Sequence, residues 1–389
     1  MQLSLTFVTG LIAAGLALAA PAPTGSDDAM LRVPLTKRRI DLFVSDDSDL
    51  IDDDKVSIHI KKLRNKYSHT LENLALHENN EQKRAISNIP LEPQGPTASF
   101  YSGNVQFGGQ TLNIDFDTGS SDVTLNKGAW KPTTNSVRTG KRFQNVYGTA
   151  TNRKVVEGEV YQDSFASGNV KASKASIGLI TGSDNIIDGA DGLVGLAYPS
   201  ISNYGSALPP LFDSLMQQNA VTNKVFGFSL GPQGSELTLG GIDSSKYSGQ
   251  ITYTPVTKQA YWEVDASVNG QRFSSLIDTG TTLVVAPTQQ AISFFRRIGA
   301  TPTQARSGDI YGVVPCNQVP KITFTYGGKQ IAMEGDSSVF GRVDSSRCAL
   351  SIIGADFGQQ AWITGDSLLV NTYTVFDRAQ NRVGFATKK

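Results

Sequence analysis

The sequence has very little histidine. Its three histidines, His59, His69 and His77, all lie in the first 80 of 389 residues. The chain after residue 84 therefore has no imidazole with which to build a Ser-His-Asp triad, a Cys-His pair or a His-ligated zinc site. If that part of the chain hydrolyses a peptide bond, carboxylates must serve as its general acid and its general base.

Cysteine is also scarce, and the chain has no excess of charge of either sign. The two cysteines, Cys316 and Cys348, are too few for a disulfide scaffold. The 35 basic residues balance 35 acidic ones, so the chain lacks the basic excess typical of nucleic-acid binding, and we expect no nucleic-acid partner. Hydrophobic residues make up 39% of the chain, which is enough for a large core and excludes disorder throughout. The length predicts two or three compact units.

Long hydrophobic runs are absent except near the N-terminus. Residues 3–20 are mainly apolar, and this run ends in small residues before Pro21. The pattern predicts a secretory signal peptide over residues 1–20, cleaved near Ala19 or Ala20. An uncleaved membrane anchor is the alternative, which the short, glycine-broken run disfavours. We therefore expect a secreted chain without a membrane anchor, although delivery to a vacuole or lysosome would use the same signal.

Residues 21–84 differ in composition from the rest of the chain. An acidic block precedes a basic block of helical character, and the segment ends in the dibasic pair Lys83-Arg84, which suits proteolytic cleavage. We interpret residues 21–84 as a pro-segment. The acidic block consists of Asp46, Asp47, Asp49, Asp52, Asp53 and Asp54, and the basic block of Lys61, Lys62, Arg64 and Lys66.

From Ala85 onward the sequence is typical of β-structure. Short apolar runs of alternating polarity are separated by Gly, Asn, Ser and Thr, which favour turns. Helical patterns are few and short, chiefly at 207–218 and 289–298. The sequence therefore predicts an all-β body. Its clearest strands are expected at 112–116, 155–165, 225–230, 251–256 and 322–326.

This body contains an internal repeat. An Asp-Thr-Gly triplet after an apolar strand occurs at Asp117 and again at Asp278. One triplet arises by chance in roughly one chain of this length in ten, but two copies in matching contexts form a far stronger signal. Each copy has a later partner of the pattern apolar-apolar-Gly, at 193–195 and, with Thr364 in the second place, at 363–365. The repeat predicts two homologous lobes, with each aspartate at the tip of a strand-to-turn loop.

Together these blocks resemble the pepsin family of aspartic proteases, in its secreted fungal type. The resemblance runs from about Phe100 to the C-terminus and rests on the blocks 116–121, 191–200, 239–243, 277–283 and 373–379. It implies an all-β, bilobal pepsin-like fold, with a lobe at 85–255, a lobe at 256–389 and the active-site cleft between them. It also implies a monomeric endopeptidase, made as a zymogen, that cleaves proteins or peptides at acid pH without a cofactor or metal.

The resemblance assigns catalysis to Asp117 and Asp278. Two carboxylates a few ångströms apart cannot both ionise. One would act as base on a shared water while its protonated partner polarises the scissile carbonyl, as in pepsin. A peptide- or protein-binding module on the same fold, with catalysis lost, is the alternative. Two intact triplets favour the enzyme.

Supporting roles follow from the same resemblance. The two threonines of the triplets would interlock the loops, and the two glycines would let substrate approach the carboxylates. The hydroxyl residue after each triplet would hydrogen-bond an outer carboxylate oxygen. Ordinary turn chemistry is the alternative for these hydroxyls. The residues concerned are Thr118, Gly119, Ser120, Thr279, Gly280 and Thr281.

The segment Tyr147-Gly148-Thr149 resembles the tip of the family's flap, a hairpin whose tyrosine lies over the bound peptide. A surface strand aromatic is the alternative for Tyr147. Thr149 resembles the pepsin-like form of this position, which implies a preference for substrates with bulky apolar residues beside the scissile bond. The segment also departs from the family: Ala150 replaces a glycine, Arg153 and Lys154 lengthen the tip, and Thr124 stands where a tryptophan usually supports the flap tyrosine.

Three further features follow from the resemblance. Cys316 and Cys348 are spaced as the disulfide of the second lobe, with two free thiols as the alternative. Lys66-Tyr67 stands where the family's zymogens place a lysine on the catalytic carboxylates. Lys83-Arg84 offers a site for a kexin-like processing protease, which would leave Ala85 as the new N-terminus. The alternative is that the basic block is a solvated helix face and the pro-segment only assists folding.

Overall fold

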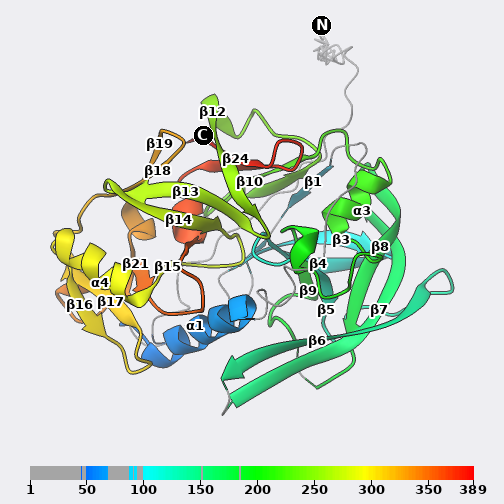
Figure 1. The fold of residues 1–389 in the computed structure, drawn as a ribbon, viewed down its shortest axis with the longest axis horizontal. Helices are drawn as coiled ribbons and strands as arrows, with labels where there is room; N and C mark the ends of the chain where they lie inside the picture. The colour runs from blue at the N-terminus through cyan, green and yellow to red at the C-terminus, as the bar shows by residue number, and fades with distance from the viewer. Residues whose placement is uncertain are drawn as a thin grey trace, which may run out of the picture.

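The computed structural model describes residues 45, 50–68, 87–90, 92–93, 100–149, 152–183 and 185–389. The signal peptide that we predict at 1–20 and the dibasic pair Lys83-Arg84 lie outside these residues. Within them the chain is mainly β, as Figure 1 shows. Each strand expected from the sequence is present, so the prediction of an all-β body is confirmed.

An eight-stranded sheet holds the first Asp-Thr-Gly triplet. Its strand order is β2-β3-β4-β9-β5-β8-β7-β6. The strands are β2 (Glu92–Pro93), β3 (Tyr101–Phe107), β4 (Gln110–Asp117), β5 (Val123–Leu125), β6 (Val137–Thr149), β7 (Asn152–Ser167), β8 (Val170–Ile180) and β9 (Gly192–Gly195).

A second sheet, of sixteen strands, holds the second triplet. Its main path is β1-β11-β10-β23-β24-β12-β13-β14-β22-β15-β21-β17-β16, and β18, β19 and β20 branch from it. The boundary that we predict between residues 255 and 256 falls inside β12. The strands are β1 (Ser87–Pro90), β10 (Val225–Ser229), β11 (Glu236–Leu239), β12 (Tyr247–Gln259), β13 (Trp262–Val268), β14 (Gln271–Ile277), β15 (Val284–Ala286), β16 (Thr301–Gln304), β17 (Ile310–Pro315), β18 (Ile322–Tyr326), β19 (Lys329–Met333), β20 (Val339–Arg342), β21 (Arg347–Gly354), β22 (Trp362–Thr364), β23 (Tyr373–Asp377) and β24 (Arg382–Lys388).

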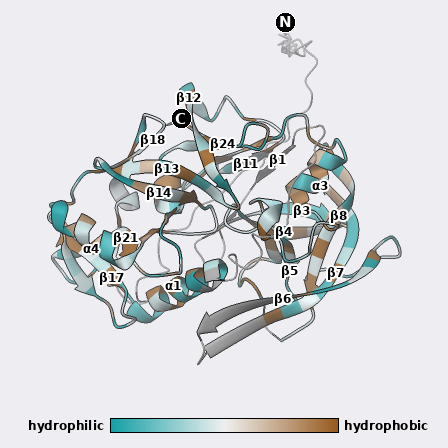
Figure 2. Ribbon diagram, viewed as in Figure 1, coloured by the Kyte–Doolittle hydropathy of each residue, from teal (hydrophilic) through white to brown (hydrophobic). Residues whose placement is uncertain are grey.

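Short helices cover these sheets. The two helices expected from the sequence are α3 (Leu211–Gln217) and α4 (Thr288–Arg297), and α5 (Asp366–Leu369) follows β22. Both α3 and α4 end where the backbone turns left-handed, at Asn219 and Gly299. Single-turn 3₁₀ helices lie at η1 (Pro199–Ile201) and η2 (Gly335–Ser337). Brown, hydrophobic residues in Figure 2 lie within strands such as β13 and β14, and the largest buried cluster draws on both sheets.

The helix α1 (Asp53–Ser68) confirms the helical character of the basic block. The Asp52 carboxylate accepts the backbone N–H groups of Asp54 and Lys55 and so caps its N-terminus. Four apolar side chains at helical spacing are buried, namely Val56, Ile60, Leu63 and Tyr67. In Figure 1 the helix lies between the hairpin of β6 and β7 and the elements that follow β14. Among the described helices, none is both long and apolar enough to cross a membrane.

Candidate active site

Asp117 and Asp278 stand at equivalent places in the two sheets. Asp117 ends β4, and Asp278 directly follows β14. Each strand has a parallel neighbour that arrives later in the chain, β9 beside β4 and β22 beside β14. Both aspartates therefore lie at the carboxyl end of a buried strand, as the repeat predicts.

Gly195 and Gly365, at the ends of these parallel neighbours, have no room for a side chain. A Cβ at Gly195 would overlap the backbone of Ser120 and Ser121, and a Cβ at Gly365 would overlap the carbonyl oxygens of Thr281 and Leu283. Each loop that carries an aspartate thus packs directly against the backbone of one of these glycines. This contact explains the glycine in both copies of the apolar-apolar-Gly pattern.

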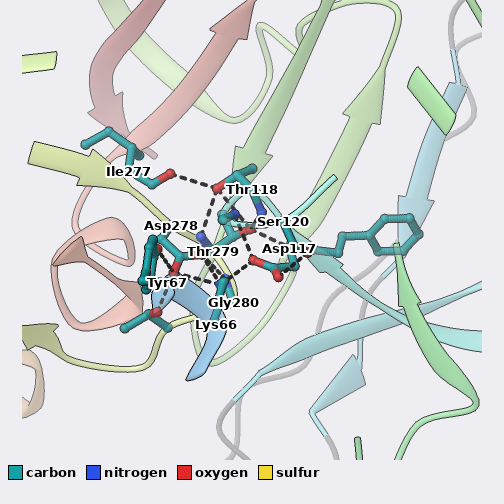
Figure 3. Close-up of polar contacts among 12 residues, drawn as sticks. Lys66, Tyr67, Asp117, Thr118, Ser120, Ile277, Asp278, Thr279 and Gly280 are labelled. Atoms are coloured by element: carbon teal, nitrogen blue, oxygen red, sulfur yellow. Dashed lines mark hydrogen bonds and ion pairs between the residues drawn. The ribbon is translucent and has the colours of Figure 1, made fainter. Parts of the chain in front are cut away.

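The two loops are joined through their threonines. The backbone N–H of Thr118 donates to Oγ1 of Thr279 at 3.1 Å, and the N–H of Thr279 donates to Oγ1 of Thr118 at 3.0 Å. Each hydroxyl then donates to a carbonyl on the other strand, Thr118 to Ile277 at 2.9 Å and Thr279 to Phe116 at 2.7 Å. Figure 3 shows part of this exchange. It fixes the separation of the two aspartates.

Each carboxylate receives a matching pair of donors from its own loop. The hydroxyl of Ser120 and the N–H of Gly119 donate to Asp117 at 2.6 and 2.8 Å. The hydroxyl of Thr281 and the N–H of Gly280 donate to Asp278, the latter at 3.0 Å.

The glycines of the triplets stand close to the carboxylate of the opposite loop. A Cβ on Gly119 would lie 2.5 Å from an oxygen of Asp278, and one on Gly280 would overlap Asp117. The structure thus brings all eight residues of the two predicted loops together.

Neighbouring charges and hydrogen bonds separate the pKa values of the two buried aspartates. Asp117 is 2% exposed and Asp278 is 0% exposed. Burial raises the pKa of Asp117, Lys66 opposes this shift, and the neighbouring charge of Asp278 adds to it. Burial would also raise the pKa of Asp278, but Lys66 and the hydroxyl of Thr281 bring it below its ordinary value. With Lys66 docked, Asp117 therefore holds a proton more readily than Asp278.

The helix α1, which lies in the predicted pro-segment, reaches this pair. Lys66 Nζ lies 2.6 Å from Asp117 Oδ1 and 2.8 Å from both oxygens of Asp278. The hydroxyl of Tyr67 donates to Asp278 Oδ2 at 2.7 Å. Burial would lower the pKa of Lys66, but the two carboxylates raise it above its ordinary value. The ammonium thus stands between the two carboxylates (Figure 3).

Contacts with the loops that connect strands of the second sheet help to hold α1 in place. The Tyr67 ring packs against Tyr261 at 5.1 Å and Phe357 at 5.7 Å between ring centroids. Arg64 forms an ion pair with Asp309, whose side chain is fully buried. Lys61 and Lys62 are exposed, so the basic block divides into a solvated face and a docked face. The sequence did not predict the Arg64–Asp309 pair, because nothing local connects two residues 245 positions apart.

The predicted flap is the hairpin of β6 and β7. In its register, Tyr147 lies opposite Lys154 and Thr149 opposite Asn152. The neighbouring strand β8 starts to pair with β7 only at Gly158, so the hairpin extends beyond the sheet as two strands. Ala150 lies outside the described residues.

Thr124 has a partner that the sequence did not predict. Its Oγ1 lies 3.2 Å from the hydroxyl of Tyr204, a buried residue in the loop after η1. Glycines inside neighbouring strands, at 158 and 178, often mark close packing. These glycines could have indicated where a ring packs on the sheet, but they do not show that Tyr204 supplies it.

The predicted disulfide is present. Cys316 and Cys348 form a disulfide with their Cα atoms 5.0 Å apart. Among the described residues, no group of three or more His, Cys, Asp or Glu side chains is placed to hold a metal ion.

Known proteins match this chain in sequence and in structure. Residues 100–388 match the family model for eukaryotic aspartyl protease. The chain is 34% identical to an aspartic protease of Phaffia rhodozyma over 84% of each chain. It is 30% identical to secreted aspartyl protease 1 of Malassezia globosa over 99% of each chain. Among solved structures, an aspartic proteinase from Irpex lacteus superposes with a TM-score of 0.66 at 25% identity, covering 78% of this chain and 98% of its own.

Proposed function

This chain belongs to the eukaryotic aspartyl protease family and is an aspartic-type endopeptidase, and we propose that Asp117 and Asp278 are its catalytic pair and that it is made as a zymogen. One observation carries the proposal. Lys66, on the predicted pro-segment, donates to both carboxylates at the point where the two triplets meet.

In the mature enzyme, a water takes the place of the Lys66 ammonium. The ionised carboxylate removes a proton from this water, whose oxygen attacks the scissile carbonyl carbon while the protonated partner donates to the carbonyl oxygen. The tetrahedral intermediate then breaks its C–N bond. The carboxyl that gained the water's proton passes it to the leaving amine, and a hydroxyl of the intermediate returns its proton to the partner carboxylate, which restores the starting pair. No bond forms between enzyme and substrate. The proton belongs to the pair, so activity requires one carboxyl ionised and one protonated.

The hydroxyls of Ser120 and Thr281 contribute by favouring the ionised form of the carboxyl that each contacts. Tyr147, Gly148 and Thr149 are the proposed flap segment that covers the bound peptide. Bulky apolar residues are the proposed preference on both sides of the cut. The two lobes are residues 85–255 and 256–389, and the mature chain acts as a monomer on proteins or peptides.

Two routes release the pro-segment. Acid protonates the carboxylates that hold Lys66, and a kexin-like protease cleaves after Lys83-Arg84. The signal peptide directs the chain to secretion, which the name of the Malassezia globosa relative supports. A vacuole or lysosome is the alternative destination.

The test is peptide hydrolysis by acid-treated protein, with and without pepstatin, the family's transition-state-like inhibitor. We expect cleavage that pepstatin abolishes, and less than a few per cent of it in Asp117→Asn and Asp278→Asn, because an amide cannot serve as base. Asp265→Asn, on the exposed side of β13, is the matched control and should keep full activity. Protein that binds peptide but does not cleave it would instead support the binding module.

A further inference from the structure

Tyr204 belongs to a small hydrophobic cluster that includes residues of the β6–β7 hairpin. It is 3% exposed, and it belongs to the loop that follows η1. The cluster is separate from the main core and lies where the hairpin leaves the sheet. Its buried members are Phe143, Val156, Val160, Ile180, Tyr204 and Leu208.

Two glycines make space for the rings of Tyr204 and Phe143. A Cβ on Gly178 of β8 would overlap the tyrosine hydroxyl, and a Cβ on Gly158 of β7 would lie 2.6 Å from the Phe143 ring. Neither glycine has a positive φ, so their role is to leave room rather than to permit a turn. Thr124 is paired with Gly178 across β5 and β8. The strands are thus shaped around an aromatic ring that comes from elsewhere in the chain.

The hydroxyl of Tyr204 fixes the ring to β5. It donates to the carbonyl oxygen of Val123 at 2.6 Å. Because a phenol has one proton, the contact with Thr124 Oγ1 at 3.2 Å requires the threonine to donate. Tyr204 therefore makes two hydrogen bonds that a phenylalanine could not make.

The loop that carries Tyr204 is bound to the loop that carries Asp117. Asp122 accepts the hydroxyl of Ser202 on one oxygen and the backbone N–H of Asn203 on the other, the latter at 2.7 Å. The hydroxyl of Ser121 donates to the carbonyl oxygen of Tyr198. Ser121 and Asp122 lie four and five residues after Asp117, so the position of Tyr204 is set by the active-site loop.

The other side of the ring contacts the hairpin. The centroids of Tyr204 and Phe143 are 5.4 Å apart, with the planes tilted by 51°. Phe143 lies on β6 opposite Gly158, at the last point where the hairpin is supported by β8. Beyond it the two strands continue to Tyr147 without a third strand in the described chain.

From these contacts we propose that Tyr204 is a positioning residue, which holds the base of the β6–β7 hairpin at a fixed place relative to Asp117. The proposal rests on the proposed function, because it requires that the hairpin tip contacts substrate. Tyr204 acts through Tyr147 and not on the reacting atoms. The hairpin can then close over a peptide at the same distance from the dyad in each turnover.

The first measurement compares Tyr204→Leu with the matched control Phe165→Leu, at a core position on β7 that is 1% exposed and lies outside the cluster. Active sites are counted by pepstatin titration. Misplacement of the hairpin should lower kcat/KM per active site by roughly tenfold or more in Tyr204→Leu. Phe165→Leu should lower Tm but leave kcat/KM within about twofold. Equal kinetic losses in both variants would overturn the proposal.

The decisive measurement is a double-mutant cycle with Tyr147→Ala. If Tyr204 acts through the hairpin tip, Tyr204→Leu should change kcat/KM by less than about twofold once Tyr147 is absent. Losses that multiply would show that Tyr204 acts elsewhere and would overturn the proposal. Should Tyr204→Leu fail to fold, Phe143→Leu removes the same ring contact from the hairpin side and is tested in the same cycle. If the unmutated protein cleaves no peptide at all, that result would instead contradict the proposed function.

Discussion

Thr118 and Thr279 exchange hydrogen bonds between the two sheets, the backbone N–H of each donating to the hydroxyl oxygen of the other at 3.1 and 3.0 Å. Both residues are buried, at 1% and 2% exposure. Water cannot replace either acceptor. The exchange therefore links the stability of the fold to the geometry of the catalytic pair.

Thr118→Val should reduce stability and activity together. Valine keeps the shape but leaves the N–H of Thr279 without its acceptor and the carbonyl of Ile277 without its donor. A buried group left unsatisfied costs about 1–3 kcal/mol. Urea unfolding should show this loss in Thr118→Val but not in the control Thr118→Ser, which keeps the hydroxyl. An unchanged unfolding midpoint in the valine variant would contradict the structural role.

Tyr147→Ala should lower turnover on peptides with little change in Tm. At Tyr147, β6 pairs only with β7, because β8 joins β7 first at Gly158, so once the segment that carries α1 is removed, no third strand supports this end of the hairpin. Tyr161 is the control, because it packs on Trp130 within the sheet, and Tyr161→Ala should lower Tm with little effect on kinetics. A large loss of Tm with unchanged kinetics in Tyr147→Ala would favour a packed strand aromatic instead.

The sequence predicted the elements that depend on local signals. The repeated triplets located the two strand ends, their hydroxyl partners and the glycines, because a tight turn at a strand end requires those residue types at fixed spacing. The basic block at 61–66 likewise indicated a helix, and the structure contains it as part of α1. Tyr204 could not be predicted in this way. Its partner Thr124 is 80 positions away, and only the folded sheet brings the tyrosine over Gly178.

Activation of the precursor should depend on Lys66. With Lys66 in place the pKa of Asp278 is lowered, so this contribution to docking is present above the carboxyl's ordinary pKa. It is lost as pH falls through the lowered value. Lys66→Ala should therefore become active at a higher pH than the parent precursor, as measured by peptide cleavage after stepwise acidification.

Arg84→Ala separates the two routes of activation. It should resist a kexin-like protease but still release the pro-segment in acid, because it leaves the Lys66 contacts unchanged. The chain length after each treatment is read by mass spectrometry. If the parent precursor, Lys66→Ala and Arg84→Ala are equally active before acidification and all keep the residues up to 84, the zymogen proposal is wrong.

His59 should set part of the pH at which α1 is released. Its Nε2 is buried in the docked helix. Burial first, and then the charges of Lys62 and Lys66, lower its pKa from 6.5 to about 3, although Asp278 opposes the shift. The docked helix thus holds a neutral imidazole, whereas the released helix binds a proton below 6.5. Docking therefore weakens as pH falls from 6.5 towards 3. His59→Gln removes this proton uptake and should move activation of the precursor to lower pH, while His77→Gln, outside the described residues, serves as control. An activation midpoint that stays the same in His59→Gln would show that the carboxylates alone respond to acid.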